Sequence, residues 1–385
     1  MKKIIKTQHH SWRIGNLPEG CKHCIRGAKT VLLVTGLCSS GCWYCPLSER
    51  KKGKDIVVAN EWWIKKDSEI LREAELCDSS GAGITGGDPL CRIDRTVRYI
   101  KLLKKKFGKK FHIHLYTSGE LATHENLGRL YNAGLDEIRF HPDFLNPKFK
   151  KSHGLENALK FRWSVGCEIP VIPGEFEKTK KFVDYANRIG VDFLNLNELE
   201  MSETNADGME KHDFEPISDV SFAVNGSREM AMKLLEYCAK NTKLRVHFCT
   251  VKLKDGVQLK NRMKRRAKNI AKDYDIITDE GLLVRRAIYL PEFVPSFHYK
   301  KKIESIKIEK RKIILKKLSK KVVELKRRFQ IPSNLIEADA RKLRILTGAW
   351  IVEEIAKDLK KSGLKSAVVE EYPTWDGLCV DLRML

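Results

Sequence analysis

Three cysteines stand close together in one short segment, Cys38, Cys42 and Cys45, with the spacing C-x3-C-x2-C. Three thiolates this close can each bind one iron of a 4Fe–4S cube, because such clusters are held through cysteine sulfur. The fourth iron then has no protein ligand nearby and is open to a ligand from outside. An open iron of this kind is the chemical requirement for binding and reductively cleaving S-adenosylmethionine (SAM).

The cysteines also permit a second interpretation, a four-cysteine zinc site. Cys21 and Cys24 form a C-x2-C pair that lies 17 residues before the pair Cys42 and Cys45. This spacing falls within the range of zinc ribbons and would indicate a zinc-dependent RNA-binding module. Two observations count against it. Cys38 is left over, and the connecting residues 29–36 are typical of a core strand.

A second motif favours the cluster. Thr85-Gly-Gly-Asp-Pro89 follows directly on the next expected strand, at 81–85. The two glycines let the backbone approach a ligand closely, and Pro89 restricts the chain after Asp88. A lone Gly-Gly pair is weak evidence, but at the end of the strand that follows the three cysteines it is strong.

With these two motifs the chain resembles a radical SAM enzyme, the GGDP segment being a version of the Gly-Gly-Glu-Pro motif. Within that superfamily it resembles the archaeal proteins related to the pyruvate formate-lyase activating enzyme. The resemblance implies a 4Fe–4S cluster on Cys38, Cys42 and Cys45. It also implies contacts to SAM from Tyr44, Gly86, Gly87, Asp88, Thr117 and Ser118. The family usually has Glu at the position of Asp88. In the family, however, the amino group of SAM is bound there largely by backbone atoms, so the change to Asp is compatible with the resemblance.

The chemistry that this resemblance implies starts with one-electron reduction of the cluster. SAM is then cleaved to methionine and a 5′-deoxyadenosyl radical, which removes a hydrogen atom from the substrate. The cofactors supply the difficult chemistry, and the protein positions the reactants and excludes water. An external electron donor is required.

Short apolar runs alternate with helical patterns through the first 250 residues, which predicts parallel strands joined by crossover helices. Strands are expected at 31–34, 81–85, 111–116, 137–141, 167–172, 191–196 and 244–248. Helices are expected near 60–77, 93–107, 121–132, 154–163, 176–189 and 228–241, with a long loop or insertion at 200–227. The fold class is therefore α/β, and the resemblance implies a partial (β/α)6-type TIM-like barrel.

The remaining residues predict an accessory α+β domain. We expect an N-terminal extension with the C-x2-C pair at 1–28, the barrel at 29–250 and the accessory domain at 251–385. One long helix is expected near 300–329, with an apolar stripe on one face and almost only Lys and Arg on the other.

The net charge of +23 is placed unevenly, since residues 251–350 hold 28 Lys and Arg against 11 Asp and Glu. Such a block indicates a polyanion partner or a solvated lysine-rich surface. Three substrate classes follow. The main hypothesis is RNA, most plausibly tRNA that the enzyme modifies, bound through residues 251–350. The alternative is a protein, as for a glycyl-radical activase. A small metabolite ranks third because it leaves the basic block unexplained.

An auxiliary metal site is a further hypothesis. Cys21 and Cys24 need two more ligands, and Cys249 ends the last expected strand, where it could approach them. A second iron–sulfur cluster or zinc would be held by these three cysteines, with His23 or His247 as the fourth ligand. Alternatively, Cys249 is a small buried apolar residue. His141, Glu168 and Glu198 stand near strand ends, where a site or a satisfied polar core would suit them equally.

Further properties limit the class of protein. No stretch reaches the ~18–20 apolar residues that cross a bilayer, and the N-terminus has no apolar signal region. We therefore expect a cytoplasmic, oxygen-sensitive protein whose eleven cysteines serve metals or redox chemistry instead of disulfides. The oligomeric state does not follow from the sequence.

Overall fold

Seven parallel strands form the centre of the larger of two units in the computed structural model, which describes residues 1–146 and 153–385. The chain divides into the units Met1–Arg262 and Met263–Leu385. The predicted domain boundary at 250 falls at the end of β13, before α9 (Val251–Leu253) and α10 (Lys260–Ile270). Within the described residues, no helix is both long and apolar enough to span a membrane.

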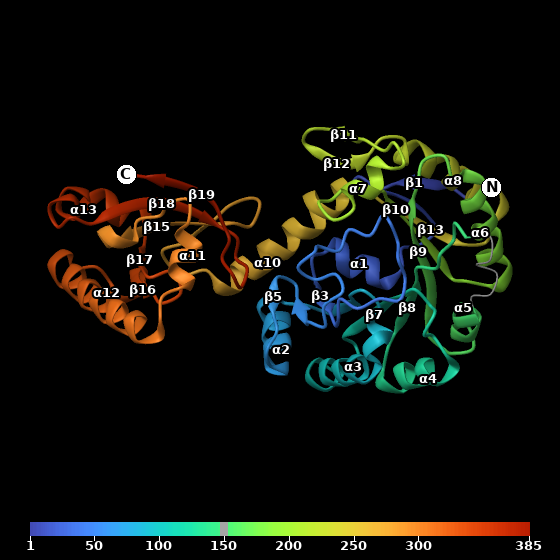
Figure 1. Cartoon of the computed structure of the whole chain (residues 1–385), viewed down its shortest axis with the longest axis horizontal. Helices are drawn as coiled ribbons and strands as arrows, with labels where there is room; N and C mark the ends of the chain where they lie inside the picture. The colour runs from blue at the N-terminus through green and yellow to red at the C-terminus, as the bar shows by residue number, and fades with distance from the viewer. Residues whose placement is uncertain (147–152) are drawn as a thin grey trace. The chain divides into compact units, whose positions relative to one another are not determined.

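The seven strands follow one another in the order β13-β10-β9-β8-β7-β6-β3 (Figure 1). Their bounds are β3 Lys29–Leu33, β6 Gly81–Thr85, β7 His112–Thr117, β8 Glu137–Phe140, β9 Ser164–Val171, β10 Phe193–Glu198 and β13 Arg245–Cys249. Each overlaps an expected strand. Antiparallel strands cover both edges of this partial barrel, which has no pairing between β3 and β13. They are β1 (Ile4–Lys6) and β2 (Trp12–Ile14) beyond β13, and β4 (Val58–Ala59) and β5 (Trp62–Trp63) beyond β3.

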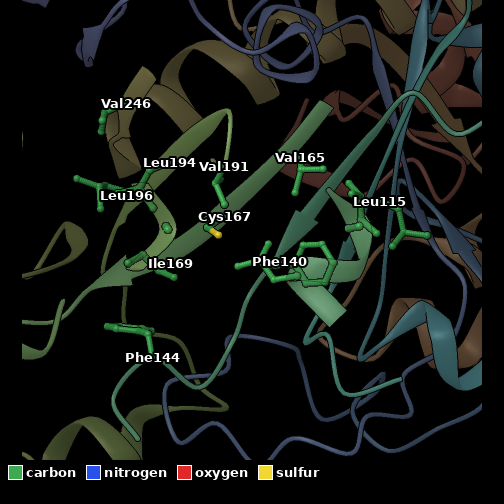
Figure 2. Close-up of a cluster of buried hydrophobic side chains, with 14 of the residues drawn as sticks. Leu115, Phe140, Phe144, Val165, Cys167, Ile169, Val191, Leu194, Leu196 and Val246 are labelled. Atoms are coloured by element: carbon green, nitrogen blue, oxygen red, sulfur yellow. The ribbon is translucent and has the colours of Figure 1, made fainter. Parts of the chain in front are cut away.

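Helices connect the strands and cover their outer face. They are α2 (Asp67–Leu76), α3 (Ile93–Phe107), α4 (His124–Ala133), α5 (His153–Ala158), α6 (Phe176–Ile189) and α8 (Ser227–Asn241). Side chains alternate between the two faces of a strand. The outer face is apolar, as Figure 2 shows for Leu115, Phe140, Cys167 and Leu194, while Tyr116, Glu168 and Asn197 on the other face line a cavity.

The expected helix near 60–77 begins later than predicted. Asn60 has φ of 51° and turns the chain between β4 and β5, so Trp62 and Trp63 form an edge strand and α2 starts at Asp67. Asparagine tolerates this left-handed conformation. Its side chain also accepts a hydrogen bond from the Val31 amide (2.9 Å) and donates one to Glu73 (2.9 Å), which fixes the turn against β3 and α2.

The segment at 200–227 is an insertion with structure of its own. It holds α7 (Ala206–Glu210) and a hairpin of β11 (Pro216–Ser218) and β12 (Ser221–Val224), which lie beside one another near α7 in Figure 1. A short helix, α1 (Glu19–Ile25), carries Cys21 and Cys24, and both cysteines are buried.

The second unit is an antiparallel sheet in the order β16-β17-β15-β18-β19, with β14 paired to β15. The strands are β14 Ile276–Ile277, β15 Leu283–Tyr289, β16 Ile336–Asp339, β17 Arg344–Thr347, β18 Lys365–Glu371 and β19 Cys379–Met384. The helices α12 (Ile308–Phe329) and α13 (Ala349–Lys361) bury their apolar faces on one side, where Ile288, Leu318 and Ile355 share a core. This arrangement confirms the expected α+β class.

The prediction of one long helix at 300–329 was wrong. The chain forms α11 (Tyr299–Glu304) and then α12, because Lys307 is extended (φ −60°, ψ 151°). Ser305 donates its hydroxyl hydrogen to the Lys302 carbonyl (2.9 Å), a local bond that competes with helix continuation. The apolar spacing continues across this break, which is why periodicity did not reveal it.

Candidate active site

The loop after β3 brings Cys38, Cys42 and Cys45 to the wall of one cavity of about 610 Å³. Cys38 is exposed and the other two thiols are half-buried. Burial raises the pKa of Cys38 and of Cys42; the charge of Asp88 raises that of Cys38 further, and the charge of Cys45 adds to both. The loop lies at the carboxyl end of a barrel strand, where TIM-like folds place their chemistry.

The donor set suits a cluster better than a single metal ion. Among the described residues, no group of three or more His, Cys, Asp or Glu side chains is placed to hold one ion. A 4Fe–4S cube makes a different demand, since each iron takes its own thiolate and the sulfurs need not converge on one point. Three cysteines around an open cavity meet that demand.

The glycine motif holds the cysteine loop in place. The Gly87 amide donates to the Thr35 carbonyl (2.8 Å) and the Asp88 amide to the Leu37 carbonyl (2.7 Å). A Cβ on Gly87 would lie 2.2 Å from the Leu37 oxygen, so no larger residue fits there without a backbone shift. Gly86 and Gly87 also line the cavity, as the predicted SAM contact requires.

Asp88 has a role that sequence reasoning missed. Its carboxylate is fully buried and accepts hydrogen bonds from the Leu90 amide (2.9 Å), the Thr117 hydroxyl (2.9 Å), and the Ser118 amide and hydroxyl (3.0 and 2.7 Å). It therefore ties the end of β6 to the end of β7. Thr117 and Ser118 line the cavity, while contact of any of these residues with SAM stays a prediction.

Tyr44 closes the cavity on the side of β8. Its hydroxyl is 3.0 Å from His141 Nε2, and His141 Nδ1 is 2.8 Å from the Glu168 carbonyl oxygen. A carbonyl only accepts, so Nδ1 carries the hydrogen and the hydroxyl of Tyr44 donates to Nε2. Burial lowers the pKa of His141 and raises that of Tyr44, so the pair is neutral.

A buried ion network continues from there into the barrel. Glu168 accepts hydrogen bonds from Arg139 (2.8 Å), Asn195 (2.9 Å) and Asn197 (3.0 Å), and Arg139 also pairs with Glu137 (2.5 Å). Burial by itself would raise the pKa of Glu168, but Arg139 and the two amides outweigh it and lower this pKa to about 2. The sequence carried a signal for this network, the alternation of polar residues along Glu137–Phe140 and Phe193–Glu198.

The cysteines of the proposed auxiliary site lie deeper, against this network. Arg139 and Asn195 donate hydrogen bonds to Cys21 Sγ (3.5 and 3.2 Å), and burial raises the pKa of that thiol to about 12. Cys249 packs with Ile25 and Leu253 in an apolar cluster, as expected for the alternative that it is a small buried apolar residue. Metal binding by Cys21, Cys24 and Cys249 stays a prediction.

Comparison with known proteins places these features in a family. The radical SAM superfamily matches residues 32–196, and a domain of unknown function (DUF8061) matches residues 305–383. A protein of Methanocaldococcus jannaschii, named as a candidate glycyl-radical enzyme activating enzyme, is 39% identical over 376 residues, which cover 95% of this chain and 92% of that protein. The chain belongs to the radical SAM superfamily. The family confirms the prediction of a SAM-dependent radical enzyme with a 4Fe–4S cluster.

The solved structures that resemble this chain are more distant in sequence. The Streptococcus suis SuiB structure with its precursor peptide SuiA has a TM-score of 0.44 and 14% identity, covering 58% of this chain and 48% of that one. Coproporphyrinogen III oxidase from Escherichia coli has a TM-score of 0.36 and 12% identity, covering 58% of this chain and 56% of that one. This chain thus spans about half the length of these neighbours.

Proposed function

We propose that this radical SAM enzyme abstracts a hydrogen atom from a protein substrate, as a glycyl-radical activating enzyme does. The similarity to the Methanocaldococcus jannaschii protein carries the proposal, because it extends over 92% of that protein and includes both units of this chain. A protein substrate was the alternative to RNA in our sequence analysis, and this relative favours it.

The site is suited to this reaction. A 4Fe–4S cluster on Cys38, Cys42 and Cys45 would supply the electron that cleaves SAM. Asp88 holds Thr117 and Ser118 at the cavity wall, and Tyr44 and His141 form a neutral pair that also lines the cavity. The cavity of about 610 Å³ is within the ~300–1,000 Å³ range of single-ligand pockets. A macromolecular substrate can therefore insert only a small part beside SAM.

The experiment measures 5′-deoxyadenosine formed by anaerobically reconstituted enzyme with SAM and dithionite. Macromolecular fractions of extract from cells that encode the protein are added untreated, after protease, or after RNase. We expect stimulation that protease removes and RNase leaves intact. Stimulation that only RNase removes would establish RNA as the substrate class, and no stimulation by any fraction would contradict a macromolecular substrate.

RNA modification remains a second candidate because of α12. Its 22 residues hold ten Lys and Arg against two Glu. Lys312, Lys316 and Lys320 recur every four residues, are exposed, and have no ion-pair partner among the described residues. A row of free cations fits a phosphate backbone, and binding through it would weaken steeply with salt.

The auxiliary site is the remaining proposal, as a second iron–sulfur cluster, because no three His, Cys, Asp or Glu side chains among the described residues converge on a single ion such as zinc. Two observations support it. Cys249 packs against Ile25, the last residue of the helix α1 that carries Cys21 and Cys24. His247, on the same strand, is buried with neither ring nitrogen hydrogen-bonded. Iron and zinc content of the Cys21→Ala/Cys24→Ala variant tests the site, and unchanged metal content would contradict it.

A further inference from the structure

The insertion at 200–227 is acidic in a basic protein. It contains seven Asp and Glu and one Lys, whereas the whole chain has a net charge of +23. Of these seven carboxylates, Glu200 forms an ion pair with Lys254 at 3.1 Å. The other six carboxylates are exposed and have no ion-pair partner in the part of the chain that the structure describes: Glu203, Asp207, Glu210, Asp213, Glu215 and Asp219.

This insertion is built onto the loop that carries the cysteines. Asn205 donates a hydrogen bond to the Tyr44 carbonyl (3.1 Å), and the Trp43 ring stacks on His212 with centroids 4.0 Å apart. Gly208 packs so closely that a Cβ there would lie 2.6 Å from the Trp43 carbonyl oxygen. These contacts span the residues between Cys42 and Cys45, so the insertion is held at the cluster loop.

The insertion also continues the wall of the cavity. Glu198, Leu199 and Glu200 line the cavity just before the insertion. The chain returns to that wall through β12, where Ala223 bridges to Glu200 and the Met201 amide donates to the Phe222 carbonyl (2.7 Å). The hairpin of β11 and β12 is therefore joined directly to the edge of the site.

The tip of this hairpin is apolar and uncovered. Ile217, Val220 and Phe222 are 53%, 94% and 65% exposed. Single exposed apolar residues are ordinary, but three within six residues of one hairpin, 217–222, form an exposed apolar patch. Apolar anchors surrounded by charged residues are the usual composition of a protein–protein interface.

We propose that the hairpin of β11 and β12 is the docking surface for the protein substrate, and that it binds a basic segment with an apolar anchor. The inference rests on the proposed function. Charge complementarity determines the partner, because six free carboxylates attract Lys and Arg and repel the phosphates of RNA. The apolar tip supplies the anchor contact, and the link to Glu200 places the docked segment beside the cavity.

Two variants test the surface, using the reconstituted enzyme and the protein fraction that stimulates it. Val220→Asp/Phe222→Asp removes the anchor, and Glu210→Lys/Glu215→Lys/Asp219→Lys reverses the charge. We expect each to lower the stimulated rate of 5′-deoxyadenosine formation about tenfold at limiting fraction, as loss of an anchor or of charge complementarity does. The basal rate without the fraction should not change, since none of these residues lines the cavity.

Matched controls lie in the second unit. Phe297→Asp alters a side chain that is 98% exposed, and Glu304→Lys/Glu309→Lys/Glu354→Lys changes the net charge by the same amount at exposed positions. Both should keep wild-type stimulation. If the hairpin variants also keep it, or the controls lose it equally, the docking inference is wrong.

The outcomes separate this inference from the proposed function. Stimulation that is protease-sensitive but independent of the hairpin contradicts the docking surface alone. Stimulation that is RNase-sensitive contradicts the proposed function. Sedimentation velocity adds one further check. A wild-type dimer that the hairpin variants convert to a monomer would assign the surface to a second copy of this chain and overturn the inference.

Discussion

Each unit of the molecule buries an ion network of similar composition, and the two networks differ in what surrounds them. In the barrel, Glu168 pairs with Arg139, whose side chain is 1% exposed. In the second unit, Glu371 pairs with Arg344 (2.7 Å) and Lys342 (2.5 Å), and the side chains of Glu371 and Arg344 are 3% exposed. Both carboxylates have a pKa lowered to about 2 by their cationic partners, against the effect of burial.

The difference lies in geometry. Glu168 stands on a parallel strand and lines the cavity that also holds the three cysteines, whereas Glu371 ends β18 in an antiparallel sheet and does not line it. A perturbed pKa marks a site only when the group also faces a cavity. We therefore expect the barrel network to serve the reaction and the network of the second unit to serve stability.

The largest effect is expected from the cysteine loop. Cys38→Ala/Cys42→Ala/Cys45→Ala should abolish 5′-deoxyadenosine formation and remove the bound cluster iron, because a 4Fe–4S cluster is held through cysteine sulfur and the variant has none left in this loop. Cys379→Ala, an exposed cysteine of the second unit, should keep both. Product formed by the triple variant would show that these three cysteines are not required for SAM cleavage.

The second effect concerns Glu371. Its pKa of about 2, against an ordinary 4.5, means that its charged form favours the folded unit. That stability is fully present above pH 4.5 and is lost as the pH falls through 2. Glu371→Gln should lower the free energy of unfolding at pH 7 by about 3 kcal/mol. Hydrogen exchange of peptides from β18, followed from pH 7 downward, measures the loss.

Glu168→Gln is the counterpart in the barrel. It should lower 5′-deoxyadenosine formation about tenfold, because Asn197, which lines the cavity, loses the carboxylate that orients it and Arg139 loses its charged partner. Glu371→Gln should leave that rate at its wild-type value under conditions where the protein is folded. Equal losses of activity in the two variants would remove the distinction between the networks.

A smaller effect is expected at Asp88. Asp88→Asn keeps the shape of the side chain but removes the charge that accepts hydrogen bonds from Thr117 and Ser118. SAM affinity, measured by equilibrium dialysis of the reconstituted protein, should fall about tenfold, as expected for loss of one buried charged acceptor. Iron content should not change, and a fall in iron would show that Asp88 supports the cluster loop instead.

The smallest effect is expected on α12. Lys312→Ala/Lys316→Ala/Lys320→Ala should change the free energy of unfolding by less than about 0.5 kcal/mol, because exposed unpaired side chains contribute little to stability. Basal SAM cleavage should also stay unchanged. A filter-binding titration with tRNA at two salt concentrations then tests whether these lysines bind RNA. Loss of salt-dependent binding in this variant would favour RNA as the substrate.

Much of the barrel could be predicted because the hydrophobic patterns of its strands and helices lie within short stretches of sequence. Alternation of apolar runs and helical patterns located the seven parallel strands, and α3 and α6 match the expected bounds 93–107 and 176–189. The cysteine and glycine motifs followed from residue types and spacing alone. The turn at Asn60 and the break near Lys307 were not predicted, because each depends on the backbone conformation of one residue and leaves the hydrophobic pattern unchanged.

The amino-acid sequence by itself determined the chemistry, since three thiolates and a Gly-Gly turn at adjacent strand ends are properties of residue type and order. Only the tertiary structure decided which polar residues meet. The Asp88 carboxylate reaches Thr117 and Ser118 across 29 and 30 residues of chain, and Asn205 reaches Tyr44 across 161. Such partners are set by strand order and register, and a linear pattern does not encode the distance between two strand ends. The same reason separates Glu168 from Glu371, which carry the same charge and differ in that only Glu168 lines the cavity.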